Sequence, residues 1–242
     1  MVRFLFSTYV WLYYSVLFLL FFIIIAVLFI FTFPFDRYNK ITNRVLAKMA
    51  WMMMRPSPTW KIHIEGEEKY DPSKPTIFIA NHQSFMDIPL AFQLKWRMKW
   101  VVKHSMTYIP VMGWMVRLTG HLTINRSSKS ALKKLSKLVK PLKDLVPVMI
   151  FPEGTRSLDG KIKTFKNGAF LLAKEHGFLL QPIVIDGAHS ALASGSKLFN
   201  PKAKFKLRVL DSIDPNAFES MTALRDHARE VIITAHEELT NS

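Results

Sequence analysis

The sequence predicts an α/β domain with a mostly buried, mixed sheet flanked by helices, preceded by an N-terminal helical segment embedded in a membrane. Short apolar runs such as 76–80 and 147–151 are typical of buried strands, and they alternate with stretches of helical spacing. An apolar run over residues 4–35 contains no charged side chain, which indicates a membrane segment. We therefore expect residues 1–56 to form a membrane anchor and residues 57–242 to form the folded domain.

The N-terminal run is long enough to cross a bilayer, since a spanning helix needs roughly 20 apolar residues. It is too long for the apolar region of a signal peptide, and no small-residue cleavage site follows it. A tilted span and a helix lying partly within one leaflet both fit this run.

Residues 38–54 predict a second, amphipathic helix at the membrane interface. Lys40, Arg44 and Lys48 recur there at helical spacing opposite apolar residues, and Trp51 would lie at headgroup depth. A helix packed on the domain core has the same pattern and remains the alternative.

The formal net charge of +15 falls almost entirely outside the apolar run. Such a basic domain is typical of proteins that bind nucleic acid or an anionic membrane surface. The apolar N-terminus favours the membrane, and the sequence has no pattern typical of a nucleic-acid-binding module, so we expect no nucleic-acid partner. Five basic residues lie within 37–55, against Arg3 alone before the run, which predicts a domain on the cytoplasmic face, at the inner membrane if the protein is bacterial.

The elements of the domain follow from apolar periodicity. Strands are predicted at 61–65, 76–80, 99–103, 122–125, 147–151, 179–186 and 202–209, the last near the sheet edge because basic and apolar residues alternate along it. Helices are predicted at 130–145, 168–176 and 220–239, with Gly177 ending the second. Pro141 should kink or shorten the first of these helices.

The first polar cluster follows the strand at 76–80. Pro89 is tolerated only in the first turn of a helix, so a helix should begin near residues 84–88 and leave His82 in the preceding turn. His82 and Asp87 can then meet, which two residues five apart on one regular helix could not do. A His with an adjacent carboxylate is a general base with its orienting group, although this spacing alone is a weak motif.

A second polar cluster lies at 151–157, directly after a buried strand. Arg156 offers a guanidinium fork suited to phosphate, and Gly154 permits a close backbone approach. A third cluster is weaker: Lys103 and Arg126 each follow a predicted strand. The alternatives are a plain polar turn at 151–157 and solvated surface cations at Lys103 and Arg126.

Together these stretches resemble the glycerolipid acyltransferases of the 1-acyl-glycerol-3-phosphate acyltransferase type. The resemblance covers most of residues 60–190, with the family's four sequence blocks in order. Residues 81–87 match the first block, with its His-x4-Asp pattern, and residues 151–157 match the third without departure. The second block is matched by Lys103, Ile109–Pro110, Gly113 and 120–126, and the fourth by 181–185. The sequence departs from the family at Gln181 and at 122–125, where other residue types are usual.

The resemblance implies transfer of a fatty acyl group from an acyl thioester to the sn-2 hydroxyl of lysophosphatidic acid, giving phosphatidic acid. The thioester would be acyl-CoA or acyl carrier protein, and membrane lipids would be the other partners. His82 would be the general base and Asp87 its orienting carboxylate. The implied substrate-binding residues are Lys103, Arg126, Glu153, Gly154, Thr155 and Arg156. In this group the cations would hold the acceptor phosphate, and Glu153 would position the glycerol portion. Backbone groups around Gly154 would stabilise the negative charge that develops on the thioester carbonyl oxygen.

The sequence implies no metal and no further cofactor, because no two histidines have zinc-ligand spacing and the chain has no Cys. Three other functions remain open: a related acyltransferase with another lysophospholipid or an aminolipid as acceptor, a non-catalytic lipid-binding protein of the membrane surface, and a hydrolase with Ser84 as nucleophile. Ser84 lacks the Gly-x-Ser-x-Gly elbow, so we expect it to be structural, as a helix cap. The basic stretch 129–143 would contact anionic headgroups or an acidic donor carrier, or form a solvated helix face.

Overall fold

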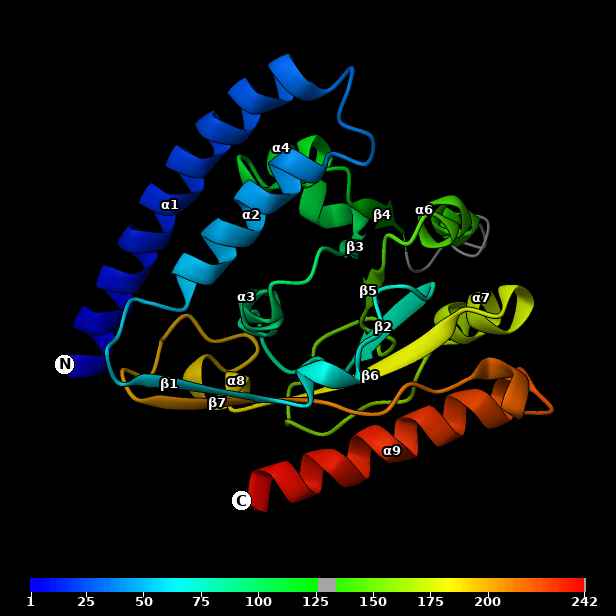
Figure 1. Ribbon diagram of the computed structural model, residues 1–242. Helices are drawn as coiled ribbons and strands as arrows, with labels where there is room; N and C mark the ends of the chain where they lie inside the picture. Colours follow the sequence, from blue (N-terminus) through cyan, green and yellow to red (C-terminus); the bar gives the residue numbers. More distant parts are fainter. Residues whose placement is uncertain (126–133, 242) are drawn as a thin grey trace.

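The computed structural model describes residues 1–125 and 134–241, in which a seven-stranded sheet lies between two layers of helices (Figure 1). Along the sheet the strands lie in the order β1-β7-β6-β2-β5-β3-β4. The strands are β1 (Trp60–Glu65), β2 (Thr76–Ala80), β3 (Lys99–Lys103), β4 (Leu122–Ile124), β5 (Val148–Ile150), β6 (Leu179–Asp186) and β7 (Ala203–Val209). The described α-helices are α1 (Val2–Thr32), α2 (Lys40–Met53), α3 (Asp87–Ala91), α4 (Met112–Leu118), α6 (Val139–Lys143), α7 (Gly168–His176), α8 (Ala188–Ala191) and α9 (Met221–Asn241). Short 3₁₀ helices join them: η1 (Glu67–Lys69), η2 (Phe92–Leu94), η3 (His104–Tyr108), η4 (Ser136–Leu138) and η5 (Pro215–Ala217).

The sheet is mixed, as the sequence predicts. Strands β6, β2, β5, β3 and β4 run parallel, whereas β7 is antiparallel to β6 and pairs in parallel with β1. The carboxyl ends of the parallel strands therefore lie at one edge of the sheet. Because β2 pairs directly with β5, the loops that begin at Asn81 and Phe151 leave that edge side by side. Open α/β sheets bind their ligands at this edge.

Helices cover both faces of the sheet. On β2, Phe78 and Ala80 point into a core cluster with residues of α1, α2 and α3, whereas Ile77 and Ile79 point into a cluster with α6, α7 and α9. All four side chains are fully buried. Figure 1 shows the same division, with α1, α2, α3 and α4 on one side of the sheet and α9 on the other. A strand with both faces covered needs the continuous apolar run that 76–80 provides.

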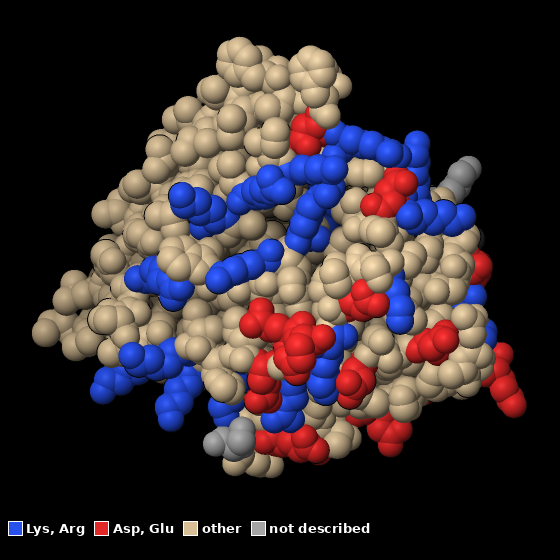
Figure 2. All heavy atoms as spheres, viewed as in Figure 1, with Lys and Arg blue, Asp and Glu red and all other residues tan. Residues whose placement is uncertain are grey.

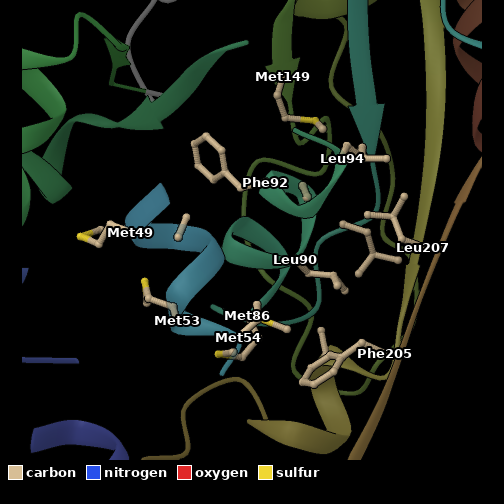
Figure 3. Packing of buried hydrophobic residues seen from close by; sticks show 14 of the residues in the cluster. Met49, Met53, Met54, Met86, Leu90, Phe92, Leu94, Met149, Phe205 and Leu207 are labelled. Carbon is tan, nitrogen blue, oxygen red and sulfur yellow. The ribbon is translucent and has the colours of Figure 1, made fainter. Parts of the chain in front are cut away.

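Methionine side chains lie on both sides of α2. Figure 3 shows Met54 next to Met86 and the short helix α3, whereas Met49 and Met53 lie on the opposite side of α2. These side chains are at most 3% exposed. Unbranched thioether side chains adapt to irregular gaps, which suits a junction between a long helix and a turn.

Helix α1 has 31 residues and is the described helix that is long and apolar enough to cross a membrane, by length and composition. One stripe of α1 packs on the domain, since side chains at intervals of three or four residues are buried: Ser7, Val10, Tyr14, Leu17, Phe21 and Ile25. The hydroxyls of Tyr13 and Tyr14 donate to the carbonyls of Met52 and Met53 at the end of α2, at 2.9 and 2.8 Å. The rest of its surface exposes large apolar side chains. α1 and α2 thus share one core with the sheet.

The apolar side of α2 differs in part from the sequence expectation. Leu46 and Met49 are buried within the protein, while Ile41 and Trp51 are 39% and 38% exposed. Amphipathic spacing alone fits both a helix packed on the domain core and a helix that faces a membrane. The burial of Leu46 and Met49 agrees with the first of these alternatives. An interfacial position for α2, and a division of the chain at residue 56, remain predictions.

Most predicted elements are present within a residue or two of their expected bounds. Gly177 ends α7 in the left-handed conformation, with φ of 69°. Pro141 lies in the first turn of α6, which begins only at Val139, so the expected shortening is observed. β7 lies one strand in from the edge strand β1. Arg126 and the first part of the predicted helix at 130–145 lie outside the described residues.

The packing of α9 gives a direct test of the core on the second face. Ile232 is fully buried there, so Ile232→Ala should lower the free energy of unfolding by about 2–5 kcal/mol through lost burial and a residual cavity. The matched control is Thr234→Ala, at an exposed position on the same helix, which should change it by less than about 0.5 kcal/mol. Urea denaturation of both variants would measure the difference, and equal effects would contradict the placement of α9.

Candidate active site

Two loops meet at the carboxyl edge of the sheet and bring the predicted His and Asp together. His82 lies in the turn between β2 and α3, and Asp87 is the first residue of α3, as the position of Pro89 predicts. The Nδ1 atom of His82 lies 2.7 Å from Oδ2 of Asp87. His82 is 9% exposed and Asp87 is fully buried. The pair is therefore preformed.

Asp87 fixes the shape of the turn as well as the imidazole. Its Oδ2 atom also accepts hydrogen bonds from the backbone N–H groups of Gln83 and Ser84, at 2.7 and 2.8 Å. This oxygen therefore faces Nδ1 of His82 and two backbone N–H groups as their common acceptor. The proton of the neutral imidazole consequently resides on Nδ1, and Nε2 is the nitrogen that can accept a proton from a substrate.

The loop after β5 holds His82 from the other side. The ring of Phe151 stacks on the imidazole with 3.9 Å between centroids and 9° between planes. The backbone N–H of Ser157 donates to the His82 carbonyl at 2.8 Å. The Gln83 side-chain amide donates to the Gly160 carbonyl at 2.6 Å and lies 3.1 Å from Nε2 of His236 on α9. The turn that carries the base is thus tied to two other segments of the chain.

Glu153 joins the same two loops. Its Oε1 accepts from the backbone N–H of His82 at 2.7 Å, and its Oε2 accepts from the N–H of Lys163 at 3.0 Å. The side chain is 3% exposed. Burial raises the pKa of Glu153 to about 7, although the hydrogen bonds from Lys163 and His82 favour the ionised form.

A cavity of about 610 Å³ opens beside His82. Its apolar wall comes largely from the first layer of helices, with Phe18 of α1 and Met115 of α4 among the side chains that border it. The α2 residues in this wall are Leu46, Met49, Ala50 and Met53. Cavities of this size and apolar lining are typical of small-molecule sites.

The charged groups that border the cavity are all cationic. Lys103, Arg156 and Lys166 line it, and none of the described residues around it is Asp or Glu. His121 also borders it, but burial lowers the pKa of that imidazole to about 3, so it adds no charge. A site with several cations and no carboxylate favours a multiply charged anion such as a phosphate.

Gly154 allows one of these cations to reach the cavity. Its φ is 74°, a conformation that other residues adopt at a cost, and a Cβ there would lie 2.9 Å from Cε of Lys166. Thr155 and Arg156 follow it and border the cavity. The left-handed turn therefore favours glycine, and the flexible end of the Lys166 side chain passes close to it.

The structure thus brings His82, Asp87, Lys103, Glu153, Gly154, Thr155 and Arg156 to one edge of the sheet, as the sequence predicts. Arg126 lies outside the described residues. Glu153 differs from the rest, because its carboxylate binds two backbone N–H groups and is absent from the described residues that line the cavity. The sequence analysis did not name Lys166 or Phe151 as site residues. Phe151 lies in the family block 151–157, but nothing in the sequence indicated that its ring stacks on His82.

Ser84 is structural. It is fully buried, and its hydroxyl donates to the Leu192 carbonyl at 2.6 Å while accepting from the N–H of Met86 at 3.2 Å. The expected helix cap is absent from α3, which has no side-chain cap, because Ser84 lies two residues before the N-cap Met86. A hydroxyl enclosed in this way is unsuited to nucleophilic attack on a bound substrate. Within residues 1–125 and 134–241, no group of three or more His, Asp or Glu could hold a metal ion.

This arrangement has a definite chemical capacity. A neutral imidazole oriented by a buried carboxylate can take the proton of a hydroxyl. The cavity next to it accepts an apolar chain, and the cations at the same place accept a phosphate. The site is therefore suited to an amphiphile that carries a hydroxyl near an anionic group.

Comparison with known proteins agrees with this capacity. A model of the family described as Acyltransferase matches residues 61–186. A 1-acyl-sn-glycerol-3-phosphate acyltransferase of Chlamydomonas reinhardtii is 36% identical over 83% of this chain and 60% of its own length. A chloroplastic enzyme of the same description from Arabidopsis thaliana is 34% identical over 67% of this chain and 46% of its own length. The chain thus spans about half the length of these curated relatives.

A solved structure matches over the whole chain. The crystal structure of the 1-acyl-sn-glycerophosphate (LPA) acyltransferase of Thermotoga maritima is 26% identical, with a TM-score of 0.79, and the match covers 99% of this chain and 97% of that one. The matched region therefore includes the N-terminal helices α1 and α2.

The fit between Gly154 and Lys166 can be tested by stability. Gly154→Ala should lower the free energy of unfolding by about 1–3 kcal/mol, because the new Cβ adds a contact with Lys166 to the backbone cost of a positive φ. The matched control is Gly195→Ala, where φ is 84° but nothing lies within 4 Å of the added Cβ. A larger loss at residue 154 than at residue 195, measured by urea denaturation, is expected. Equal losses would show that the Lys166 side chain moves away freely.

Proposed function

This chain belongs to the acyltransferase family, and we propose from this premise that it transfers a fatty acyl group from an acyl thioester to the sn-2 hydroxyl of lysophosphatidic acid, giving phosphatidic acid. The observation that carries the proposal is the hydrogen-bonded pair of His82 and Asp87 at the mouth of an apolar cavity whose charged residues are all cations. The relatives named above act on the same class of lipid.

His82 acts as the general base. An alcohol is a poor nucleophile at neutral pH, so Nε2 of His82 takes the hydroxyl proton as the oxygen attacks the thioester carbonyl carbon. Asp87 stabilises the imidazolium that forms, through the 2.7 Å contact with Nδ1. When the tetrahedral intermediate collapses, the new ester bond is complete, the C–S bond breaks, and the departing thiolate takes the proton back from His82. No covalent acyl-enzyme is needed.

The attack places negative charge on the former carbonyl oxygen, which preorganised N–H donors stabilise. The N–H of Gly154 already donates to the Phe151 carbonyl at 3.0 Å. We therefore assign the oxyanion to the neighbouring N–H groups of Thr155 and Arg156, two residues that border the cavity.

The phosphate of the acceptor is held by cations. Lys103 and Arg156 are assigned to it by the family blocks, and Lys166 is added because it borders the same cavity. A guanidinium binds phosphate oxygens through two parallel hydrogen bonds, whereas an ammonium acts as a point charge. Arg126 remains a proposed fourth contact on the basis of the family block alone.

The apolar part of the cavity receives the acyl chain. Its walls of methionine, leucine and phenylalanine side chains from α1, α2 and α4 exclude water from the chain and from the reacting thioester. Either acyl-CoA or acyl carrier protein is compatible with this cavity, since both present the chain as the same thioester. We propose no metal and no further cofactor.

The substrates reach the site from a membrane. In Figure 2 a band of Lys and Arg side chains lies beside the uncharged surface that α1 forms. Lys40, Arg44 and Lys48 are exposed on α2, where they can contact anionic headgroups. Because the buried stripe of α1 runs from Ser7 to Ile25 along the domain, we favour a helix lying within one leaflet over a helix that spans the bilayer. We propose that this leaflet faces the cytoplasm, from the excess of basic residues after the apolar run.

Activity of the purified protein tests the proposal. With lysophosphatidic acid and either acyl-CoA or acyl carrier protein thioester, the wild-type protein should form phosphatidic acid, and His82→Ala should lower kcat by about 10³-fold or more because the base is lost. Full activity of that variant would contradict the proposed role of His82 as the base. Lipid binding without turnover of either donor would favour a non-catalytic membrane-surface protein.

The acceptor site gives a separate prediction. Arg156→Gln and Lys166→Gln should each raise KM for lysophosphatidic acid by about tenfold or more, since a hydrogen bond to a charged group contributes roughly 1.5–3 kcal/mol. Lys61→Gln, on the exposed side of β1, is the control and should leave KM unchanged. Steady-state kinetics with a monoacylglycerol and an aminolipid alongside lysophosphatidic acid would complete the test. Equal turnover of acceptors with and without phosphate would instead favour another acceptor class.

A further inference from the structure

The carboxylate of Glu153 is enclosed by the protein backbone. Its two oxygens accept hydrogen bonds from the N–H groups of His82 and Lys163, at 2.7 and 3.0 Å, and only 3% of the residue is exposed. Lys163 is held in turn, because Arg229 of α9 donates to the carbonyls of Lys163 and Ile162, both at 3.1 Å. The carboxylate therefore links the turn of the catalytic base to a segment that α9 supports.

Glu153 also differs in position from its neighbours. Gly154, Thr155 and Arg156 border the cavity, whereas Glu153 is not among the described residues that do. The Glu153 carboxylate instead accepts from the backbone N–H of His82. A glycerol hydroxyl bound in the cavity would meet Thr155 or Arg156 before it met this carboxylate.

The peptide of His82 is held at both ends by one segment. Glu153 accepts from its N–H, and the N–H of Ser157 donates to its carbonyl at 2.8 Å. These two bonds fix the backbone orientation of His82, while Asp87 and Phe151 fix its ring. Loss of the first bond would let the peptide rotate and move Nε2 away from the position at which it meets the acceptor hydroxyl.

We propose that Glu153 is a positioning residue for His82, and that it does not contact the acceptor. This inference rests on the proposed function. It revises the role that the family resemblance implies for Glu153, which is to hold the glycerol portion. The ionised carboxylate is the active form, because only that form has two oxygens that both accept freely.

The charge of Glu153 is set by the groups packed around it. Burial, and to a smaller extent the carboxylate of Asp87 on α3, raise its pKa, whereas the backbone hydrogen bonds and the charge of Lys163 lower it; the net pKa is about 7. His82 contacts the carboxylate through its backbone N–H. Because the pKa lies above the ordinary value, Glu153 gains its proton as the pH falls through about 7 and the hold on His82 is then lost.

The test is the kinetic effect of Glu153→Gln. A glutamine keeps one acceptor oxygen but turns an NH2 group towards a backbone N–H, so one of the two bonds is lost. We expect kcat to fall by about 10- to 100-fold while KM for lysophosphatidic acid changes less than threefold. A KM effect larger than the kcat effect, or no effect at all, would overturn the positioning role. Glu175→Gln, an exposed Glu on α7, is the matched control and should match the wild type.

The pH profile adds a readout that a general loss of structure would not produce. In the wild-type protein, kcat should fall as the pH drops through about 7, because Glu153 then gains its proton and its hold on His82 is lost. In Glu153→Gln this fall should be absent, because no carboxylate remains at residue 153 to titrate. The same fall near pH 7 in both proteins would count against the inference.

Equilibrium binding separates this inference from the proposed function. Lysophosphatidic acid should bind His82→Ala and the double variant His82→Ala/Glu153→Gln with Kd values that differ by less than threefold. Weaker binding by the double variant would indicate that Glu153 contacts the acceptor. A circular-dichroism spectrum would confirm that both proteins are folded. If wild-type protein makes no phosphatidic acid from either thioester, the proposed function fails. If the wild type is active but kcat of Glu153→Gln is unchanged, only the positioning role fails.

Discussion

The whole site depends on two buried carboxylates that hold one turn of the backbone. Asp87 accepts three donors from within the turn, the His82 ring and the N–H groups of Gln83 and Ser84. Glu153 reaches the same turn from the neighbouring loop. A buried carboxylate is costly unless it is hydrogen-bonded. Both oxygens of Glu153 and Oδ2 of Asp87 have donors, whereas Oδ1 of Asp87 is buried without a partner among the described residues. The position of the base is thus set by the backbone as much as by its partner side chain.

The order of the strands makes this convergence possible. Because β2 lies between β6 and β5 in a parallel arrangement, the segments after β2 and β5 emerge next to each other, although about 70 residues of sequence separate them. The same edge carries Lys103 at the end of β3. The proposed base and the proposed anion-binding side chains are therefore brought together by sheet topology, and each loop needs to supply only one or two of them.

The N-terminal helices border the cavity, in addition to the membrane role proposed for them. Phe18 of α1 and several side chains of α2 form part of the cavity wall, and the tyrosines of α1 bond to the end of α2. A segment that the sequence predicts to be an anchor therefore also shapes the cavity beside His82. Under the proposed function, an apolar substrate would pass from the membrane to His82 while remaining in contact with apolar side chains.

The sequence by itself determined the features that depend on local physics. The apolar runs predicted the strands, Pro89 placed His82 before the helix, and Gly177 marked the end of α7. The residues of the family blocks identified His82, Asp87 and the cations. Only the tertiary structure decided how Glu153 is used, that Phe151 stacks on His82, that Lys166 passes over Gly154, and that Leu46 and Met49 line a cavity. Those facts depend on which loops lie side by side, and periodicity along one chain carries no information about the direction in which a side chain meets a distant segment.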